Sequence, residues 1–448
     1  MKQIFIIAFI LSTAALNSFA QQATPDTTKY NFTIADCVNY AYQHQHDVVN
    51  ANLDVTSAAY HVKEIIRQGY PQVSGSANFL DYLIVPTTLI PGSIFGQQGN
   101  LKVKFGVTYQ STLGLSATQI IFDPNYLVGL AARRTYKELY DRSYTRSKIE
   151  ANVNVTKAYY QVLVSVEQVK LLDADINQLK QQMDETVARN KQGFVEKIDV
   201  DRITLQYNSL VTNRENTLRL LGVNYELLKF QMGMPVEAVL ILKDKLEDIK
   251  LDASIVDPAR DTTVYRNRIE YNLLETQEKL NEYDVRSKKG QFLPKLTANA
   301  NYSPSYQNNS FGNLYSENFP SSYIGLTLTV PIFTGFQHTY QLKQSQINVF
   351  KSQNDLYNMK NTVNLQVDEA KASYINGLQT LDVQKKNQAL AQEVLRVAKI
   401  KYEQGVGSSI EVTQAQTDLE TADNTYIQGL YDALVSKVDQ DYAYGRIQ

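Results

Sequence analysis

The chain has 448 residues, with 44 Lys and Arg against 46 Asp and Glu, so its formal net charge is −2. With 43% hydrophobic residues it is too apolar for a disordered chain, and it lacks the charge of a basic nucleic-acid binder, so no nucleic-acid partner is expected. The single cysteine, Cys37, excludes an intramolecular disulfide and a multi-cysteine metal cluster, and 4 His leave little material for a histidine-based metal site. Only 11 Pro and 20 Gly interrupt the chain, which predicts long regular segments.

The first twenty residues have the order of features found in secretory signal peptides. Lys2 precedes an apolar stretch that starts at Ile4, and small residues stand ahead of a cleavage site after Ala20. We therefore predict that residues 1–20 are removed and that the mature chain is exported; the alternative is a buried N-terminal helix. The remaining sequence has no run of about 18 apolar residues, so any membrane-spanning part must consist of strands.

The mature sequence contains one structural unit twice. Three short segments of the first half recur in the same order in the second half, about 210 to 220 residues later. They are Pro71–Phe79 and Pro294–Tyr302, Gln119–Asp123 and Val330–Thr334, and Gln192–Val200 and Gln404–Val412. The first copy has an insertion at residues 80–104 that contains Pro86 and Pro91 and is typical of an enlarged surface loop.

Each repeat is predicted to contribute two β-strands, because apolar and polar side chains alternate along it. In the first strand Val73, Ala77 and Phe79 share one side, opposite Ser74 and Asn78. The expected strands cover about 71–80 and 105–122 in the first repeat, and about 294–303 and 322–332 in the second.

Two tracts without proline, residues 125–234 and 332–448, predict long helices. A helix from about 125 to 190 would be roughly 100 Å long at 1.5 Å per residue. Gly193 and Gly405 are the expected turns at which each long helix reverses. The first tract also has the heptad seam of a coiled coil. Its two positions are Val155, Val162, Val169, Ile176 and Met183, and Ala158, Ser165, Leu172, Leu179 and Thr186.

Shorter helices are expected over about 34–68 and about 261–290, the latter after a connector with a charged, solvated run at residues 243–248. The sequence thus predicts four parts. They are a signal peptide at 1–20, a first structural repeat at 21–234, a connector at 235–260 and a second structural repeat at 261–448.

Four strands per chain cannot close into a barrel, and a bilayer tolerates no open sheet edge. Several chains would have to share one barrel, and dimers or trimers would supply eight or twelve strands. A soluble β-sandwich hairpin is the alternative, because the alternation alone does not say which face meets lipid.

The chain resembles the TolC-type outer-membrane factors, the outer membrane efflux protein family. The resemblance rests on the duplicated order of strand, strand, long helix, glycine turn and returning helix, and on the segments Leu293–Pro294, Val330–Gly335, Lys401–Gly405 and Ile410–Val412. It implies a mostly α fold with membrane β structure. Three chains would form one twelve-strand β-barrel in the outer membrane, continuous with a twelve-helix α-barrel across the periplasm. The connector and chain ends would form an equatorial belt.

The resemblance also implies a function. The chain would be the exit duct of a tripartite efflux or type I secretion system of a Gram-negative bacterium, and would pass small molecules or polypeptides. Its partners would be two further copies, a periplasmic adaptor (membrane fusion) protein, an inner-membrane RND or ABC transporter, and outer-membrane lipid.

In this family the duct is gated at the periplasmic helix turns. By motif, Asp199 and Tyr402 match a closing carboxylate and hydroxyl, and Glu411 matches an acidic ring that faces the pore. Three symmetry-related carboxylates at a constriction favour cations. Two positions depart from the family pattern: Gly407 replaces a basic partner, and Gln414 replaces a second acidic ring. The latch would therefore be weaker or differently built, and one acidic ring would filter alone.

The turn glycines Gly193, Gly405 and Gly407 are the predicted contacts for the adaptor. For Asp199 and Glu411 a plainer interpretation is open, in which each is a cap or first-turn acid of the returning helix. Such a role contributes a few tenths to about 1 kcal/mol.

We predict no enzyme, no cofactor and no metal site. His44 and His46 are two residues apart and would point to different helix faces, while His61 and His338 have no acidic or cysteine partner at ligand spacing. Neither a Gly-rich phosphate loop nor a nucleophile elbow is present. The alternative function is a periplasmic coiled-coil adaptor or scaffold without a pore, against which the duplication argues.

Overall fold

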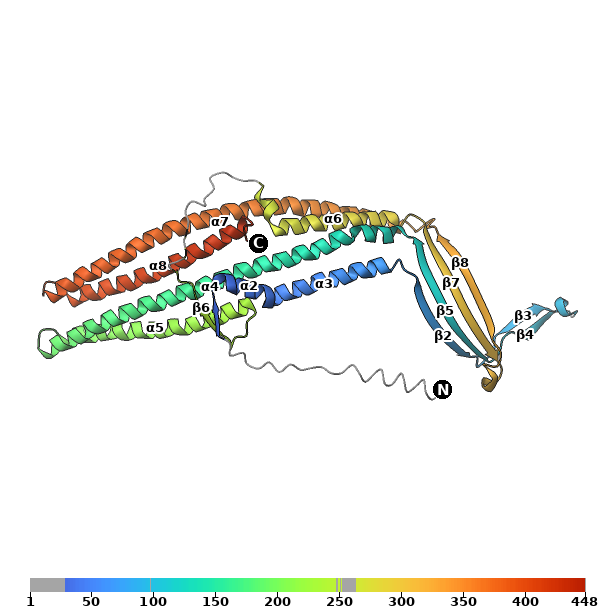
Figure 1. Cartoon of the computed structure of the whole chain (residues 1–448), viewed down its shortest axis with the longest axis horizontal. Coiled ribbons are helices and arrows are strands. Elements are labelled where there is room, and N and C mark those ends of the chain that lie inside the picture. Colours follow the sequence, from blue (N-terminus) through green and yellow to red (C-terminus); the bar gives the residue numbers. More distant parts are fainter. Residues whose placement is uncertain (1–28, 97, 247–248, 250, 252–262, 448) are drawn as a thin grey trace. The chain divides into compact units, whose positions relative to one another are not determined.

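The computed structural model describes residues 29–96, 98–246, 249, 251 and 263–447 (Figure 1). The predicted signal peptide and part of the predicted connector lie outside these residues. The chain divides into two compact units. The first consists of residues up to 49, 148–260 and 367–448, and the second of residues 50–147 and 261–366.

The second unit contains a four-stranded antiparallel sheet. Its strands are β2 (Gln72–Asp81), β5 (Tyr109–Phe122), β7 (Lys295–Asn308) and β8 (Phe319–Thr329), in the order β2-β5-β7-β8 (Figure 1). The strands of each repeat pair with each other, and β5 pairs with β7 across the repeats. Among the described residues, no strand pairs with the outer edges of β2 and β8.

The register of this sheet separates apolar from polar side chains. Leu115 pairs with Gly75 on one side and with Tyr302 on the other, while Ala300 pairs with Ile324. Because directly paired residues share a face, these side chains line one apolar face. That face also carries the exposed side chains of Val73, Phe79, Leu113, Leu326 and Leu328.

The opposite face of the sheet is polar and hydrogen-bonded. The hydroxyls of Ser74 and Ser116 lie 2.8 Å apart, and Asn299 Nδ2 donates to Thr327 Oγ1 at 2.9 Å. The alternation in the sequence therefore corresponds to two faces of different polarity.

The insertion at residues 80–104 is more ordered than the surface loop that its prolines predict. It contains an antiparallel pair, β3 (Thr87–Pro91) and β4 (Asn100–Lys104), connected through the 3-10 helix η1 (Gly92–Phe95). A further parallel pair in the first unit, β1 (Lys29–Phe32) and β6 (Val239–Leu242), brings the described residues to eight strands rather than the predicted four.

The helices of the second unit are α6 (Ile269–Gly290), which follows the 3-10 helix η4 (Val264–Asn267), and parts of α3 (His46–Arg67), α4 (Pro124–Lys191) and α7 (Gln337–Glu403). A short 3-10 helix, η5 (Phe311–Asn313), lies between β7 and β8.

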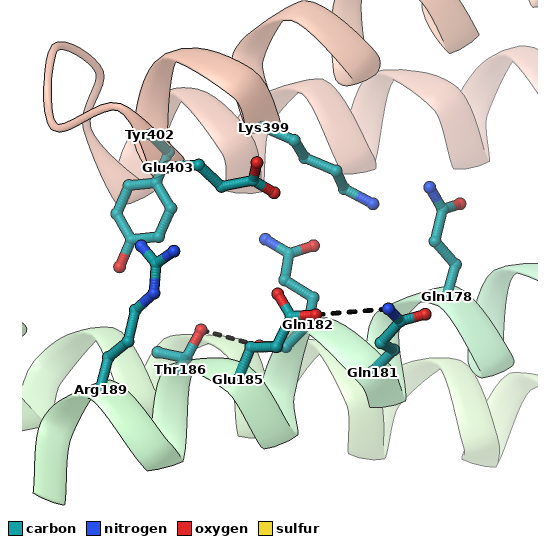
Figure 2. A pocket seen from close by; sticks show the side chains of 9 residues that line it. All are labelled: Gln178, Gln181, Gln182, Glu185, Thr186, Arg189, Lys399, Tyr402 and Glu403. Carbon is teal, nitrogen blue, oxygen red and sulfur yellow. Dashed lines mark hydrogen bonds between the residues drawn. The ribbon is translucent and has the colours of Figure 1, made fainter.

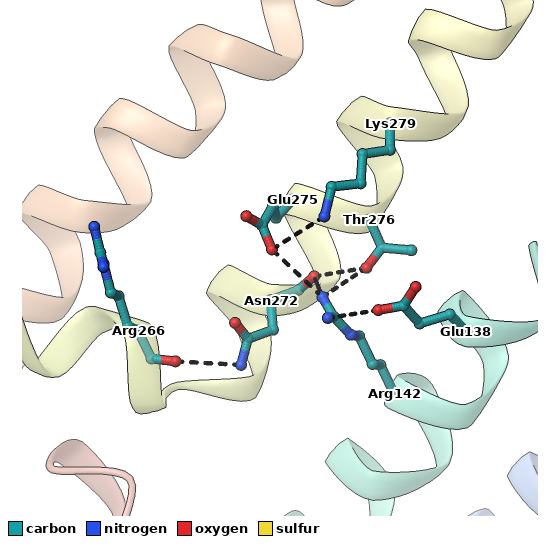
Figure 3. A network of polar contacts seen from close by, with 7 residues as sticks. All are labelled: Glu138, Arg142, Arg266, Asn272, Glu275, Thr276 and Lys279. Atoms are coloured by element: carbon teal, nitrogen blue, oxygen red, sulfur yellow. Dashed lines mark hydrogen bonds and ion pairs between the residues drawn. The ribbon is translucent and has the colours of Figure 1, made fainter. Parts of the chain in front are cut away.

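Arg142 joins α4 to α6 (Figure 3). Its guanidinium donates to Thr276 Oγ1 at 2.7 Å and to the main-chain oxygen of Asn272, and it pairs with Glu138 Oε1 at 2.6 Å. Glu275 of α6 lies 3.8 Å from the same guanidinium. Since most of its donors face oxygen atoms, this side chain fixes the two helices in one register.

The first unit contains the two helical hairpins. α4 reverses into α5 (Lys197–Met232), and α7 reverses into α8 (Ser409–Ala443). The predicted heptad seam of α4 is buried at Val155, Val162, Leu172 and Leu179. In the second hairpin, a Cβ at Gly377 would lie 3.0 Å from Ser436 Oγ and 3.2 Å from Ala433 Cα, so this glycine allows α7 and α8 to approach closely. Among the described residues, no helix combines the length and the apolar character needed to cross a bilayer.

The N-terminal helix predicted over about 34–68 is wrong as one helix. It is divided into α2 (Ile34–His44) and α3 by Gln45, which is extended with φ −66° and ψ 131°. The side chain of Gln45 accepts a hydrogen bond from Val48 N at 2.9 Å and so satisfies a donor in the first turn of α3. Gly233 packs against this break so closely that a Cβ there would clash with the main-chain oxygen of His44.

Candidate functional site: the helical turns and the interface between the hairpins

Both hairpins turn at a glycine in the left-handed region, Gly193 with φ 82° and Gly405 with φ 75°. This conformation strains residues that have a Cβ. Gly407 has a different reason to be glycine: a Cβ there would lie 2.9 Å from Lys401 Cβ and 3.0 Å from Tyr402 N. The three predicted tip residues therefore shape the two turns.

The returning helices begin close to these turns. α5 follows its N-cap residue Glu196, and α8 follows Ser408, whose Oγ accepts a hydrogen bond from Glu411 N at 3.2 Å. Asp199 lies in the first turn of α5 and Ser409 in the first turn of α8. Glu411 thus contributes its main chain to the cap of α8, while its side chain is exposed.

Asp199 connects the two hairpins. Its carboxylate accepts a hydrogen bond from Ser409 Oγ, and Arg202 lies 3.7 Å from the same carboxylate oxygen and 3.3 Å from Ser409 Oγ. One turn further along, Gln206 Nε2 donates to the main-chain oxygen of Thr413 at 3.1 Å. The Asp199 side chain is only 17% exposed, so this link is partly shielded from water.

Tyr402 lies in the same region but does not hydrogen-bond Asp199. Both residues line a cavity of about 890 Å³ at the turns, together with Gly405 and Gly407. The Tyr402 hydroxyl is buried and finds no hydrogen-bond partner among the described residues. Burial and the negative charge of Asp199 raise the pKa of Tyr402, and Arg189 acts in the opposite direction. Asp199 accepts from Ser409 instead, and Arg202 is the basic residue beside it.

A second cavity, of about 180 Å³, lies behind the turns between α4 and α7 (Figure 2). Its lining carries charges of both signs, with Glu185 and Arg189 on α4 and Lys399 and Glu403 on α7. Burial lowers the pKa of Lys399, while nearby acids raise it. The hairpins therefore meet through polar side chains here too.

Glu411 and Gln414 lie apart from this region. They share an exposed groove of about 430 Å³ along α7 and α8 with Asp418, whose Oδ1 accepts a hydrogen bond from Gln414 Nε2 at 2.8 Å. Glu411 and Asp418 are seven residues apart, hence on one helix face. That spacing could have identified Asp418 from the sequence. In the same way, Arg202 could have been identified because it lies three residues after Asp199 on one helix. No comparable signal identifies Ser409 as the partner of Asp199.

The part of the chain that the structure describes gives no support for metal binding or for a reactive cysteine. Within it, no group of three or more His, Cys, Asp and Glu side chains could hold a metal ion. Cys37 is buried, and burial raises the pKa of its thiol to about 12. Such a thiol is unreactive at neutral pH.

Comparison with known proteins gives relatives of one kind. A family model described as outer membrane efflux protein matches residues 274–439. Outer membrane protein TolC of Escherichia coli (strain K12) is 23% identical over 352 residues, which cover 75% of this chain and 70% of TolC. Among solved structures, CusC has a TM-score of 0.74 at 15% identity and covers 95% of both chains. The CmeC outer membrane channel of Campylobacter jejuni has a TM-score of 0.71 at 15% identity, covering 92% of this chain and 85% of CmeC.

The resemblance to the TolC-type outer-membrane factors is thus confirmed, and the fold is that of their channels. The predicted location in the outer membrane, with an extension into the periplasm, is confirmed as well. The similarity supports an exit-duct role, in a class of proteins that are channels rather than enzymes.

Proposed function

We propose that three copies of this chain form a gated exit duct of a tripartite efflux or type I secretion system. The observation that carries this proposal is the sheet of the second unit, which has one apolar face, one polar face and two unpaired outer edges within the described residues. Pairing β8 of one copy with β2 of the next removes every open edge and turns the apolar faces toward lipid.

The dimensions of the strands fit this assembly. β2 and β8 have 10 and 11 residues, and β5 and β7 have 14 each. A tilted strand crosses the hydrocarbon core in about 9–11 residues. Four strands from each of three chains give a twelve-strand barrel, which exceeds the minimum of about eight and leaves an aqueous lumen.

The turns fit a gate and a docking surface. The Asp199–Ser409 hydrogen bond holds one hairpin to the other, and its release would let the helices separate. Phe194 and Val406 stand beside the turn glycines and are 78% and 79% exposed. Apolar side chains presented this far into water suit contact with a partner, here the periplasmic adaptor. This assembly is compatible with an inner-membrane transporter of either the RND or the ABC class. It is also compatible with a cargo of small molecules or of polypeptides.

The assembly is tested by electron microscopy of detergent-purified protein. We expect particles with threefold rotational symmetry and a hollow helical tube that projects from the detergent micelle. Monomers, or solid rods without a micelle, would refute the channel and favour the periplasmic adaptor or scaffold.

Glu411 is proposed to line the pore, because its exposed side chain shares a groove with Asp418 along α7 and α8, close to the turn of the second hairpin. For Glu411→Gln in planar bilayers we expect the cation-to-anion permeability ratio to fall about twofold or more, since three charges leave one ring. Glu411→Asp is the control and should keep the ratio. Unchanged selectivity in Glu411→Gln would leave this residue only its role in the first turn of α8.

A further inference from the structure

Two buried acidic side chains lie between the hairpins, further from the turns than Asp199. Asp175 of α4 and Asp423 of α8 are each 8% exposed and line the same small cavity, where the negative charge of Asp423 acts on Asp175. An ionised carboxylate can only accept a hydrogen bond, so two ionised groups would repel. A close approach of the two groups therefore requires one shared proton.

We propose that the Asp175–Asp423 pair is a proton-operated latch, which holds α8 against α4 while it keeps one shared proton and releases the second hairpin when that proton is lost. The inference rests on the proposed gated duct and adds to it a dependence on periplasmic pH. The reaction at the latch is a simple dissociation. The proton leaves to water, and two carboxylates remain.

Each neighbouring helix contributes to the surroundings of the pair. From α7, Gln388 Nε2 donates to Asp423 Oδ1 at 2.7 Å, and Lys399 acts on Asp175 with its positive charge. From α8, Glu420 adds a negative charge. On α5, Leu210 and Asn213 line the same small cavity, while the charged Arg214 pairs with Asp173.

Water is largely excluded from this contact. The cavity beside the pair measures about 10 Å³, and its lining includes Leu171, Leu172 and Ile427. A cavity of this size barely reaches the volume needed for one water molecule. In such an environment the repulsion between two ionised carboxylates is strong, because little solvent screens it.

The direction of the pH effect follows from the titration of the pair. Burial, and next the negative charge of Asp423, raise the pKa of Asp175 from its usual 3.8 to about 7. Burial also raises the pKa of Asp423, against hydrogen bonds that lower it. A raised pKa in the closed contact means that the stabilisation is complete below pH 3.8 and is lost as the pH rises through about 7.

The size of the effect follows from linkage. Between the pKa of a separated, hydrated aspartate and that of the closed pair, opening releases one proton per chain. The opening constant should therefore rise up to about tenfold per pH unit below pH 7 and level off above it. Acid in the periplasm would keep the duct closed.

The test is the open probability of the full-length protein in planar bilayers from pH 5 to pH 8. We expect a steep rise toward pH 7 in the wild type. Asp175→Asn should stay closed with a flat profile, because an amide donates to the Asp423 carboxylate at every pH. The matched control is Asp173→Asn, two residues away on α4, which should keep the wild-type profile.

A second readout does not need a conducting pore. Spin labels at Asn177→Cys and Thr421→Cys, both exposed positions near the pair, report the separation of α4 and α8 in detergent. Cys37 is buried and should not react with the label. The measured distance should grow as the pH rises in the wild-type background and should stay constant with Asp175→Asn.

The outcomes separate the two proposals. A distance and an open probability that do not depend on pH, or a dependence that survives in Asp175→Asn, would overturn the latch and leave the duct intact. Absence of conductance at every pH would refute the duct, while the spin-label distance would still decide the latch.

Discussion

Replacing Leu326 with arginine is expected to remove most of the protein from the outer membrane. Leu326 is 71% exposed, stands on β8 and pairs with Ala298 on the apolar face of the sheet. An arginine on the lipid face of a barrel costs about 2–4 kcal/mol at the bilayer midplane. Three chains would each bear that cost, which is comparable with the whole stability of many folded proteins. The measurement is the amount of assembled trimer in outer-membrane fractions, resolved from unfolded monomer by gel mobility without heating.

The neighbouring residue supplies the control for this prediction. Thr327 pairs with Thr297 and accepts a hydrogen bond from Asn299 on the polar face. Thr327→Arg should assemble nearly as well as the wild type and should add positive charge to the lumen, which lowers the preference for cations. Equal tolerance of both substitutions would mean that neither face meets lipid, as in a soluble sandwich.

The strands of the four-stranded sheet and their apolar and polar faces could be predicted from the sequence, because the alternation of apolar and polar side chains has the period of a strand. The strand pair β3 and β4 could not be predicted from the sequence, because each strand has only five residues. In addition, Pro86 directly precedes β3 and Pro91 is its last residue. Short strands of this kind are stabilised chiefly by each other, and no counterpart in the second repeat marks them.

The helices show the same limit. Val155, Val162 and Leu179 follow the heptad period, and the structure buries them as that period requires. The break at Gln45 has no such signal; it packs closely against Gly233, nearly two hundred residues away in the chain. A local pattern cannot report a contact that only the folded chain creates.

The candidate site divides in a similar way. Asp199 and Tyr402 could be proposed from motifs, yet the group that binds Asp199 is Ser409, which only the packing of α5 and α8 brings near. The same holds for the contact of Arg142 with Thr276, where a long side chain reaches a neighbouring helix. Polar interfaces between helices depend on side-chain reach and register, for which residue type and spacing give few constraints.

Replacing Asp199 with alanine is expected to raise the resting conductance of the duct roughly 10- to 150-fold. The substitution removes the acceptor of the Ser409 hydroxyl and leaves Arg202 without that carboxylate. A hydrogen bond to a charged group contributes about 1.5–3 kcal/mol, and every 1.4 kcal/mol changes an equilibrium tenfold. The measurement is single-channel recording at fixed pH and voltage, without adaptor or transporter.

Two further variants separate a gate from a helix-stabilising acid. Asp199→Asn keeps an oxygen for Ser409 but loses the charge beside Arg202, so its conductance should lie between those of the wild type and Asp199→Ala. Asp201→Ala removes an exposed carboxylate two residues along the same helix, and should lose a weaker interaction with the helix dipole, which falls off beyond the first turn, while the duct stays closed. If Asp199→Ala lowers the melting temperature and neither variant changes conductance, Asp199 stabilises the first turn of α5 and the gate lies elsewhere. A conductance increase confined to the Asp199 variants would assign the closed state to the link between the two hairpins.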